Sequence, residues 1–258
     1  MFVSKPLVLG GKSLKFPLVC TPLVGRSYAQ ILSEVQHVLP KKPDLLEWRV
    51  DFFEGIADTV QVLALAAAIR QEAPGIPVLF TRRSRREGGE PIALDESAVL
   101  ALYAAVMQSQ TVDFVDFEMC SEPAHIAQVR AQSSAQGIGL VLSFHDFHTT
   151  PSQEALCQRF AQAQQLGADV AKIAVMPQRM EDVLVLLAAT LDSSQKLDIP
   201  VVSMSMGAYG AVTRLVGGAF GSAMSFAMGA AASAPGQLPI EDLQTVLQIV
   251  NRATRPAQ

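Results

Sequence analysis

The sequence has few cysteines, and their spacing forms no recognisable motif. Cys20, Cys120 and Cys157 are the three cysteines in 258 residues, so no CxxC or Cys/His metal-ligand spacing exists. A scattered, odd set of cysteines is typical of reduced thiols in a reducing compartment. We therefore expect a protein without disulfides and without a metal site.

The chain also lacks a long apolar run and an excess of positive charge. No run of about 18 apolar residues occurs, so no membrane span is expected. The opening MFVSKPLVLGGKSLKF is broken by Pro6 and Gly10-Gly11, which argues against a signal peptide. The net charge is −4, so the overall charge does not attract nucleic acid or anionic lipid. The expected location is the cytoplasm, with no membrane or nucleic acid as partner.

One dense cationic stretch, TRRSRRE at 81–87, runs against this charge balance. Clustered arginines can bind nucleic acid, usually together with aromatic side chains that stack on bases. No aromatic residue is interleaved here. We interpret the stretch as a solvated loop with one arginine that serves a substrate.

Half of the residues are apolar, and they fall into short runs that alternate with helical patterns from end to end. The predicted strands are 17–25, 44–51, 77–83, 113–119, 139–147, 170–177, 199–207 and 222–229. The clearest helix pattern covers 180–191. Eight strand-and-helix units in this length predict an α/β fold, a single (β/α)₈ barrel domain over 1–258. An open doubly wound sheet is the alternative, but no GxGxxG follows the first strand.

The first residues, 1–16, have a different pattern from the barrel units. PLVLGGKSLKF has two short extended segments around Gly10-Gly11, which favours a β-hairpin with its turn at the two glycines. We expect this N-terminal hairpin to close the bottom of the barrel.

Alternation along the strands predicts which side chains enter the barrel. In DLLEWRVD, Leu46, Trp48 and Val50 share the face that should meet the helices. The opposite faces of four strands carry polar groups toward their C-terminal halves. These inward residues are Glu47, Arg49, Asp51, Asp116, Glu118, Ser143, His145 and Lys172. Structural ion pairing could explain such charges. However, the C-terminal ends of the strands form the mouth of a barrel where active sites lie.

Lys172 lies in the apolar run VAKIAVMP, where an ammonium is rarely buried without a use. An apolar slot favours the neutral amine, which is a nucleophile toward ketones and aldehydes. The resulting iminium makes the neighbouring C–H acidic, and His145 is a suitable proton acceptor. Glu87 is a candidate to hold the imidazole. Arginines in the barrel suggest that the substrate carries a carboxylate or another anion. These residues alone do not separate an aldolase from a dehydratase.

Two further hypotheses remain open. A class I aldolase or transaldolase would also use Lys172 and would bind a sugar phosphate near Gly217-Gly218 and the SAPGQ segment. An inactive barrel used as a binding module would lack the lysine or the histidine, and both are present. His148 follows His145 closely, but HxxH at the end of a strand is a poor metal site without further ligands.

Six motifs occur in order over the whole chain: LLEWRVD, FTRRSRREGGE, SFHDFHTTP, AKIAVMP, MSMGAYGAVTRL and SAPGQ. With them the sequence resembles the type I 3-dehydroquinate dehydratases, the Schiff-base lyases of the shikimate pathway. The resemblance implies a homodimeric eight-stranded barrel with an N-terminal hairpin. It also implies dehydration of 3-dehydroquinate to 3-dehydroshikimate without a metal or cofactor.

The resemblance assigns roles to the matched positions. Lys172 would form the Schiff base with the C3 carbonyl. His145 would remove a proton from C2 and return one to the departing hydroxyl, with Glu87 orienting its imidazole. Arg214 would bind the substrate carboxylate. The ring hydroxyls would be met by three polar residues, Glu47, Arg49 and Arg83. A loop that closes over the substrate would contribute Ser233 and Gln237.

In the first barrel strand the chain departs from the family pattern. Some relatives carry a serine in the first barrel strand where this chain reads TPLVG. Pro22 cannot make the hydroxyl contact, and the sequence leaves open whether Thr21 replaces it.

Overall fold

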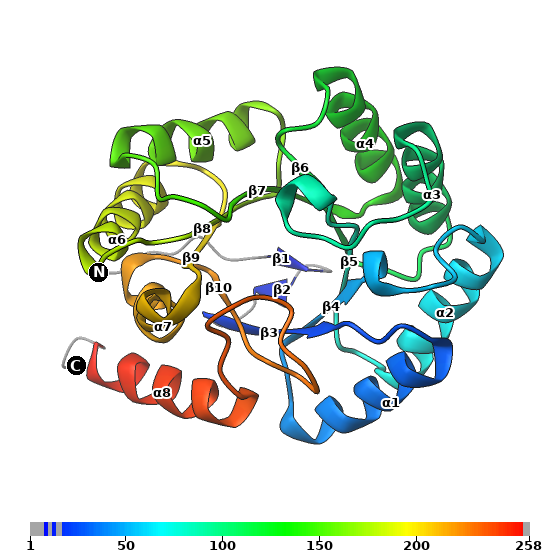
Figure 1. The fold of residues 1–258 in the computed structure, drawn as a ribbon, viewed down its shortest axis with the longest axis horizontal. Coiled ribbons are helices and arrows are strands. Elements are labelled where there is room, and N and C mark those ends of the chain that lie inside the picture. The colour runs from blue at the N-terminus through cyan, green and yellow to red at the C-terminus, as the bar shows by residue number, and fades with distance from the viewer. Residues whose placement is uncertain (1–7, 10–11, 14–16, 255–258) are drawn as a thin grey trace.

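Eight parallel strands form a barrel in a computed structural model of the chain, which describes residues 8–9, 12–13 and 17–254 (Figure 1). The strands are β3 (Leu18–Leu23), β4 (Leu45–Arg49), β5 (Val78–Thr81), β6 (Phe114–Glu118), β7 (Gly139–Asp146), β8 (Val170–Val175), β9 (Val201–Ser205) and β10 (Met224–Phe226). Neighbours in sequence are neighbours in the sheet, and β10 pairs with β3. A parallel bridge between Val201 and Ser222 joins β9 to the segment before β10. The predicted barrel and each predicted strand are confirmed.

The described residues contain eight α-helices, which form the outer ring of the barrel (Figure 1). They are α1 (Tyr28–Val38), α2 (Thr59–Glu72), α3 (Glu96–Gln108), α4 (Pro123–Gln136), α5 (Gln153–Gln165), α6 (Met180–Lys196), α7 (Gly207–Val216) and α8 (Ile240–Ala253). The helix predicted at 180–191 is α6, which extends further because Ser193 and Ser194 continue its buried face. Side chains of Ser27, Asp58, Asp95 and Ser152 accept backbone N–H groups at four helix N-termini.

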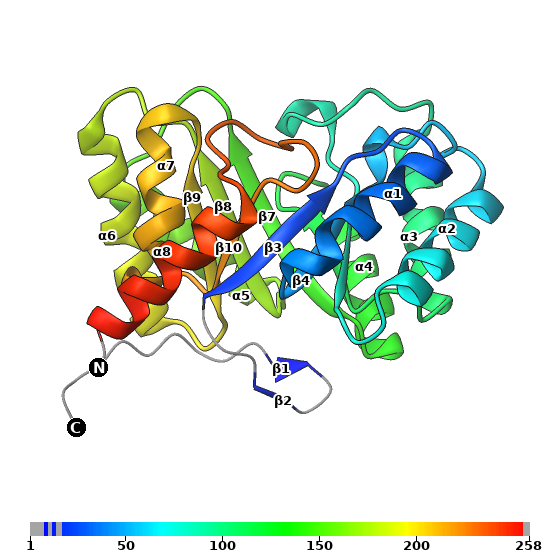
Figure 2. The same cartoon turned by 90° about the horizontal axis from the view of Figure 1, so that it is seen from below.

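Two short strands precede the barrel. β1 (Val8–Leu9) pairs antiparallel with β2 (Lys12–Ser13), with Val8 opposite Ser13. Figures 1 and 2 place this pair beneath the N-terminal ends of the barrel strands, on the barrel axis. The expected turn at Gly10-Gly11 lies outside the described residues. The boundaries 1–16 and 1–258 also include residues outside them, so these domain limits stay a prediction.

The alternation predicted along the strands is confirmed by two separate cores. Leu46, Trp48 and Val50 belong to the outer core between strands and helices, where Trp48 meets Phe80 edge to face. A second apolar cluster fills the barrel interior from the strands' other faces, and it includes Leu18, Leu45, Leu79, Phe114 and Val170. These interior residues come from the beginnings of their strands. Among the side chains that point into the barrel, the polar ones therefore lie near the C-terminal mouth.

Candidate active site

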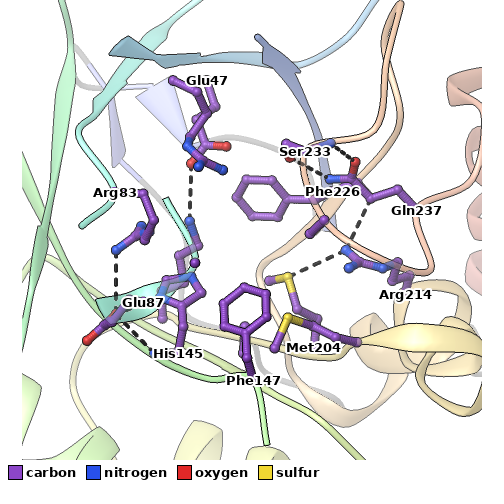
Figure 3. A pocket seen from close by; sticks show the side chains of 16 residues that line it. Glu47, Arg83, Glu87, His145, Phe147, Met204, Arg214, Phe226, Ser233 and Gln237 are labelled. Atoms are coloured by element: carbon purple, nitrogen blue, oxygen red, sulfur yellow. Dashed lines mark hydrogen bonds and ion pairs between the residues drawn. The ribbon is translucent and has the colours of Figure 1, made fainter. Parts of the chain in front are cut away.

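A pocket of about 450 Å³, partly open to solvent, lies at this mouth. Every predicted site residue lines it (Figure 3): Glu47, Arg49, Arg83, Glu87, His145, Lys172, Arg214, Ser233 and Gln237. The rest of its lining is mostly apolar and comes from Ala174, Met204, Met206, Phe147, Phe226, Gly88 and Ala234. Residues up to 190 positions apart in sequence thus meet in one cavity, because the C-terminal ends of all strands point to it.

Lys172 lies between two carboxylates. Its Nζ is 3.0 Å from Asp116 Oδ2 and 3.2 Å from Glu47 Oε1, and the side chain is only 6% exposed. It also lies 4.5 Å from the centroid of the Phe226 ring. The expected apolar slot is therefore wrong on one side. Asp116 and Glu47 enter from other strands, and the run VAKIAVMP describes only the lysine's own strand.

Asp116 is the centre of a buried polar network that sequence analysis pointed inward but gave no role. Its Oδ1 accepts hydrogen bonds from Arg83 Nη2 at 2.7 Å and from Ser143 Oγ at 2.6 Å. Burial opposes its ionisation, but the cations of Arg83 and Lys172 outweigh burial and lower its pKa below the usual range. Asp116 therefore stays ionised beside Lys172. Strand alternation was the sequence signal for it.

Arg83 connects this network to the loop that follows β5. Its Nη1 donates to Glu118 Oε1 at 3.2 Å and to Ser143 Oγ at 2.8 Å. Burial disfavours its charge, yet Asp116 and Glu118 raise its pKa above the ordinary arginine value. Most of its donors are used by protein groups, so its main effect on the pocket is electrostatic.

His145 and Glu87 form a hydrogen-bonded pair at the side of the pocket. The imidazole Nδ1 is 2.9 Å from Glu87 Oε2, which also accepts the backbone N–H of His145 at 3.1 Å. Burial lowers the pKa of His145 well below its ordinary value, and the cations of Arg83 and Lys172 lower it further. Burial raises the pKa of Glu87 to about 7, helped by Glu118 and opposed by Arg83. The imidazole is thus neutral near pH 7, as a general base must be.

Arg214 has the opposite surroundings to Lys172. It comes from the last turn of α7, is 1% exposed, and is paired with no carboxylate among the described residues. Its guanidinium donates to the carbonyl oxygens of Phe226 at 3.4 Å and Pro235 at 3.2 Å, while its buried Nε has no partner in the described part of the chain. Burial lowers its pKa to about 10. A buried cation without an anion is a binding site for one.

Ser233 and Gln237 lie on the segment between β10 and α8, which reaches over the pocket (Figure 3). Gln237 Nε2 donates to Ser233 Oγ at 3.0 Å, and Gln237 Oε1 accepts the backbone N–H of Ser233 at 2.8 Å. Arg214 contacts the same segment through Pro235. Binding of an anion at Arg214 would therefore change the contact between Arg214 and this loop.

Three residues considered from sequence lie away from the pocket lining. His148 is exposed beyond the end of β7, and its backbone N–H is bound to Asp146. Thr21 is buried and does not line the pocket, and its hydroxyl has no hydrogen-bond partner in the described part of the chain, so it makes no pocket contact in place of the missing serine. Gly218 packs against Pro17, just before the start of β3 and far from the mouth. The suggestion of a phosphate site at Gly217-Gly218 is therefore wrong.

The described residues contain neither a cluster of metal-ligating side chains nor a helix long and apolar enough to cross a membrane. The chemistry available in the pocket is instead that of an amine, an imidazole–carboxylate pair and an unpaired guanidinium. Together they suit a carbonyl compound that carries a carboxylate.

Comparison with known proteins gives the same picture. A family model for type I 3-dehydroquinase matches residues 19–254. A 3-dehydroquinate dehydratase of Albidiferax ferrireducens is 57% identical over 258 residues, which cover 99% of this chain and 98% of that protein. The crystal structure of the dehydratase from Geobacillus kaustophilus HTA426 matches with a TM-score of 0.94 at 46% identity, covering 97% of this chain and 98% of that one. A type I enzyme from Clostridium difficile, solved with covalent modified comenic acid, matches with a TM-score of 0.92 at 33% identity, covering 97% and 100%.

These matches run from β3 through α8, so they include every strand and loop that contributes to the pocket. They agree with the six sequence motifs. They also agree with the barrel fold, which the strand-and-helix pattern predicted without use of those motifs. The chain belongs to the type I 3-dehydroquinase family.

Proposed function

We propose that the protein is a 3-dehydroquinate dehydratase of the shikimate pathway that works through a Schiff base on Lys172. The observation that supports this best is the convergence of a buried amine, a neutral imidazole and an unpaired guanidinium on one cavity. Each group supplies what one part of the reaction needs. The amine takes the ketone, the imidazole moves protons, and the guanidinium binds the carboxylate.

The reaction begins when the unprotonated amine of Lys172 attacks the C3 carbonyl. Loss of water from the carbinolamine gives an iminium, which withdraws electrons from C2. His145 removes the C2 proton, and the enamine then expels the neighbouring hydroxyl, which leaves as water with the proton from His145. Hydrolysis of the remaining iminium releases 3-dehydroshikimate and the free lysine. The net change is the loss of one water from the substrate.

Electrostatics in the pocket favours the cationic intermediate. Asp116 and Glu47 lie within 3.2 Å of Lys172 Nζ, so both carboxylates can stabilise the iminium in place of the ammonium. Glu87 keeps the imidazole of His145 in one orientation through Nδ1. The apolar side chains of Phe147, Met204 and Met206 line the pocket beside these groups.

Substrate binding is assigned to the remaining pocket residues. The planar fork of Arg214 donates two parallel hydrogen bonds to the substrate carboxylate. Glu47, Arg49 and Arg83 line the part of the pocket where the ring hydroxyls would lie, with Arg83 acting mainly through its charge. Ser233 and Gln237 close the pocket from the loop before α8.

We also propose a cytoplasmic homodimer. All three cysteines are free thiols, which suits a reducing compartment. The dimer rests on the resemblance to the family and is tested by light scattering of the purified protein at micromolar concentration.

Mixing the protein with 3-dehydroquinate tests the proposed activity. We expect ultraviolet absorbance from the conjugated enone to rise with the parent and to stay flat with Lys172→Ala. A sugar phosphate offered to the parent should give no carbon–carbon cleavage. Absence of enone formation by the well-folded parent would overturn the assignment.

A further inference from the structure

Asp51 is a buried carboxylate just beyond the end of β4 that does not line the pocket. It lies in the 3-10 turn Val50–Phe52 and is 3% exposed. Four hydrogen bonds reach it: from Arg49 Nε at 2.9 Å and Nη2 at 2.8 Å, and from the backbone N–H groups of Arg83 at 3.2 Å and Glu90 at 3.1 Å. Both carboxylate oxygens are thus bound in fixed directions.

The two backbone donors lie at the two ends of one loop. Arg83 begins and Glu90 ends the segment 83–90, which carries Glu87 at its centre. Glu87 in turn contacts the imidazole of His145 at 2.9 Å. Asp51 therefore holds together the base of the loop whose tip orients the proposed general base.

The 83–90 loop is held in one conformation by its own hydrogen bonds and by close backbone packing. Ser84 accepts the N–H of Glu87 on its side chain and the N–H of Gly89 on its carbonyl. Gly88 has a left-handed φ of 82°, and a Cβ at Gly89 would collide with the carbonyl of Arg83. With so little internal freedom, a shift at the base of the loop moves Glu87 as well.

The side-chain donor connects Asp51 to substrate binding. Arg49 lines the pocket, and its guanidinium is fixed by Asp51 through two parallel hydrogen bonds and stacks 5.0 Å from the centroid of the Phe52 ring. One carboxylate thus orients two elements of the site that are 38 positions apart, Arg49 and Glu87.

We propose that Asp51 is a positioning residue of the dehydration site, acting on proton transfer through the 83–90 loop and on substrate affinity through Arg49. This inference rests on the proposed function. Groups of this kind, which orient catalytic residues from behind, typically affect activity by about 10- to 100-fold.

Asp51→Asn keeps the shape but replaces one acceptor oxygen by an NH₂ group that faces a donor. We expect kcat to fall about 10- to 100-fold and KM to rise several-fold, measured well below the melting temperature. Asp113→Asn is the matched control. Asp113 also accepts a backbone N–H and pairs with an arginine, Arg70, but at the other end of the barrel. Its replacement should lower the melting temperature and leave kcat and KM unchanged.

A double-mutant cycle separates positioning from simple stabilisation. If Asp51 acts through Glu87, Asp51→Asn should lower kcat little further in a Glu87→Gln background. If Asp51 only stabilises the fold, its replacement should leave kcat unchanged, and if it affects turnover by a route that does not involve Glu87, the two losses in kcat should multiply. Parent-like kinetics of Asp51→Asn, or multiplying losses, would overturn the inference. Should Asp51→Asn not fold, Asp51→Glu, which keeps the charge but displaces it, enters the same cycle.

A readout without turnover keeps the inference distinct from the proposed function. The NMR resonances of the His145 ring should shift, and titrate differently, in Asp51→Asn but not in Asp113→Asn. If the parent fails to dehydrate 3-dehydroquinate, the function is wrong, while unchanged His145 resonances in Asp51→Asn would show that Asp51 does not act on the pair.

Discussion

Lys172 and Arg214 carry the same formal charge in opposite surroundings. Two carboxylates lie within 3.2 Å of Lys172 Nζ, whereas Arg214 contacts carbonyl oxygens and a thioether but no carboxylate of the described chain. The lysine is therefore held in place before substrate arrives. In the proposed reaction the arginine would gain its anion only when substrate binds, so we expect its contribution to appear in affinity.

Arg214→Lys is expected to weaken substrate binding. A lysine offers a point charge on a flexible stem and cannot replace the planar fork. We expect a loss of about 2 kcal/mol or more, which is roughly a 30-fold rise in the dissociation constant. Isothermal titration with a non-reacting carboxylate analogue measures it. Equal affinity of parent and Arg214→Ala would show that the carboxylate binds elsewhere.

The two neighbouring histidines should differ sharply in their effect on turnover. His145 lines the pocket and pairs with Glu87, whereas His148 is exposed past the end of β7. His145→Ala should lower kcat by about 10²- to 10⁴-fold, the usual range for loss of a general acid–base. His148→Ala should stay within about tenfold, or roughly 1.4 kcal/mol of barrier. Comparable losses in the two variants at saturating substrate would mean that strand alternation does not identify the base.

The Glu87–His145 pair should give turnover a pH dependence near neutrality. Burial raises the pKa of Glu87 to about 7, so it is protonated below that pH and ionised above it. Ionised Glu87 accepts a hydrogen bond from the Nδ1–H of His145, which leaves Nε2 free as a base. We therefore expect kcat/KM to increase with pH through about 7. In Glu87→Gln the profile should lose this step, and a parent profile that is flat from pH 6 to 8 would contradict the account.

At the scale of the strands, the alternation of inward and outward side chains was the most informative signal in the sequence. It placed Glu47, His145 and Lys172 in the barrel interior because the alternate positions of their strands, including Trp48, Phe144 and Ile173, are apolar and pack on helices. It did not tell which inward residues lie at the same level. The contact of Lys172 with Asp116 depends on the stagger between β6 and β8, which are not neighbours in the sheet. The apolar slot expected around Lys172 was wrong for this reason.

The N-terminal ends of alternate strands share an aspartate contact that sequence reasoning did not predict. Asp44, Asp113 and Asp169, each just before its strand, accept the backbone N–H of Val19, Val78 and Leu140 on the preceding strand. Arg70 and Arg130 pair with two of these carboxylates. The carboxylates fix the register where the barrel begins, far from the pocket. Aspartates before strands are too common as turn residues for the sequence to reveal this role.

Asp113→Asn tests this aspartate contact. The variant loses a charge-assisted hydrogen bond from the Val78 N–H and an ion pair with Arg70, at 2.7 and 2.6 Å. We expect the free energy of unfolding to fall by about 1.5–3 kcal/mol, with kcat unchanged. Urea denaturation followed by circular dichroism measures it. Glu181→Gln, which alters an exposed pair with Arg179, should change stability by less than about 1 kcal/mol. Equal effects of both variants would remove the special role of the strand bottoms.

At the scale of the whole molecule, the barrel separates stability from chemistry along its axis. Apolar side chains fill the interior at the strand beginnings, and ionisable groups gather at the strand ends. The fold was predictable because its strand-and-helix repeat is regular and its motifs occur in order. The positions of Asp51 and the 83–90 loop were less so, since their contacts are made outside the strands by backbone groups.

Trapping of the imine tests the central claim most directly. The protein is mixed with 3-dehydroquinate, reduced with borohydride and analysed by mass spectrometry of its peptides. We predict one covalent adduct, located on Lys172, and none in Lys172→Ala or without substrate. An active parent that yields no adduct, or an adduct on another residue, would contradict the Schiff-base mechanism.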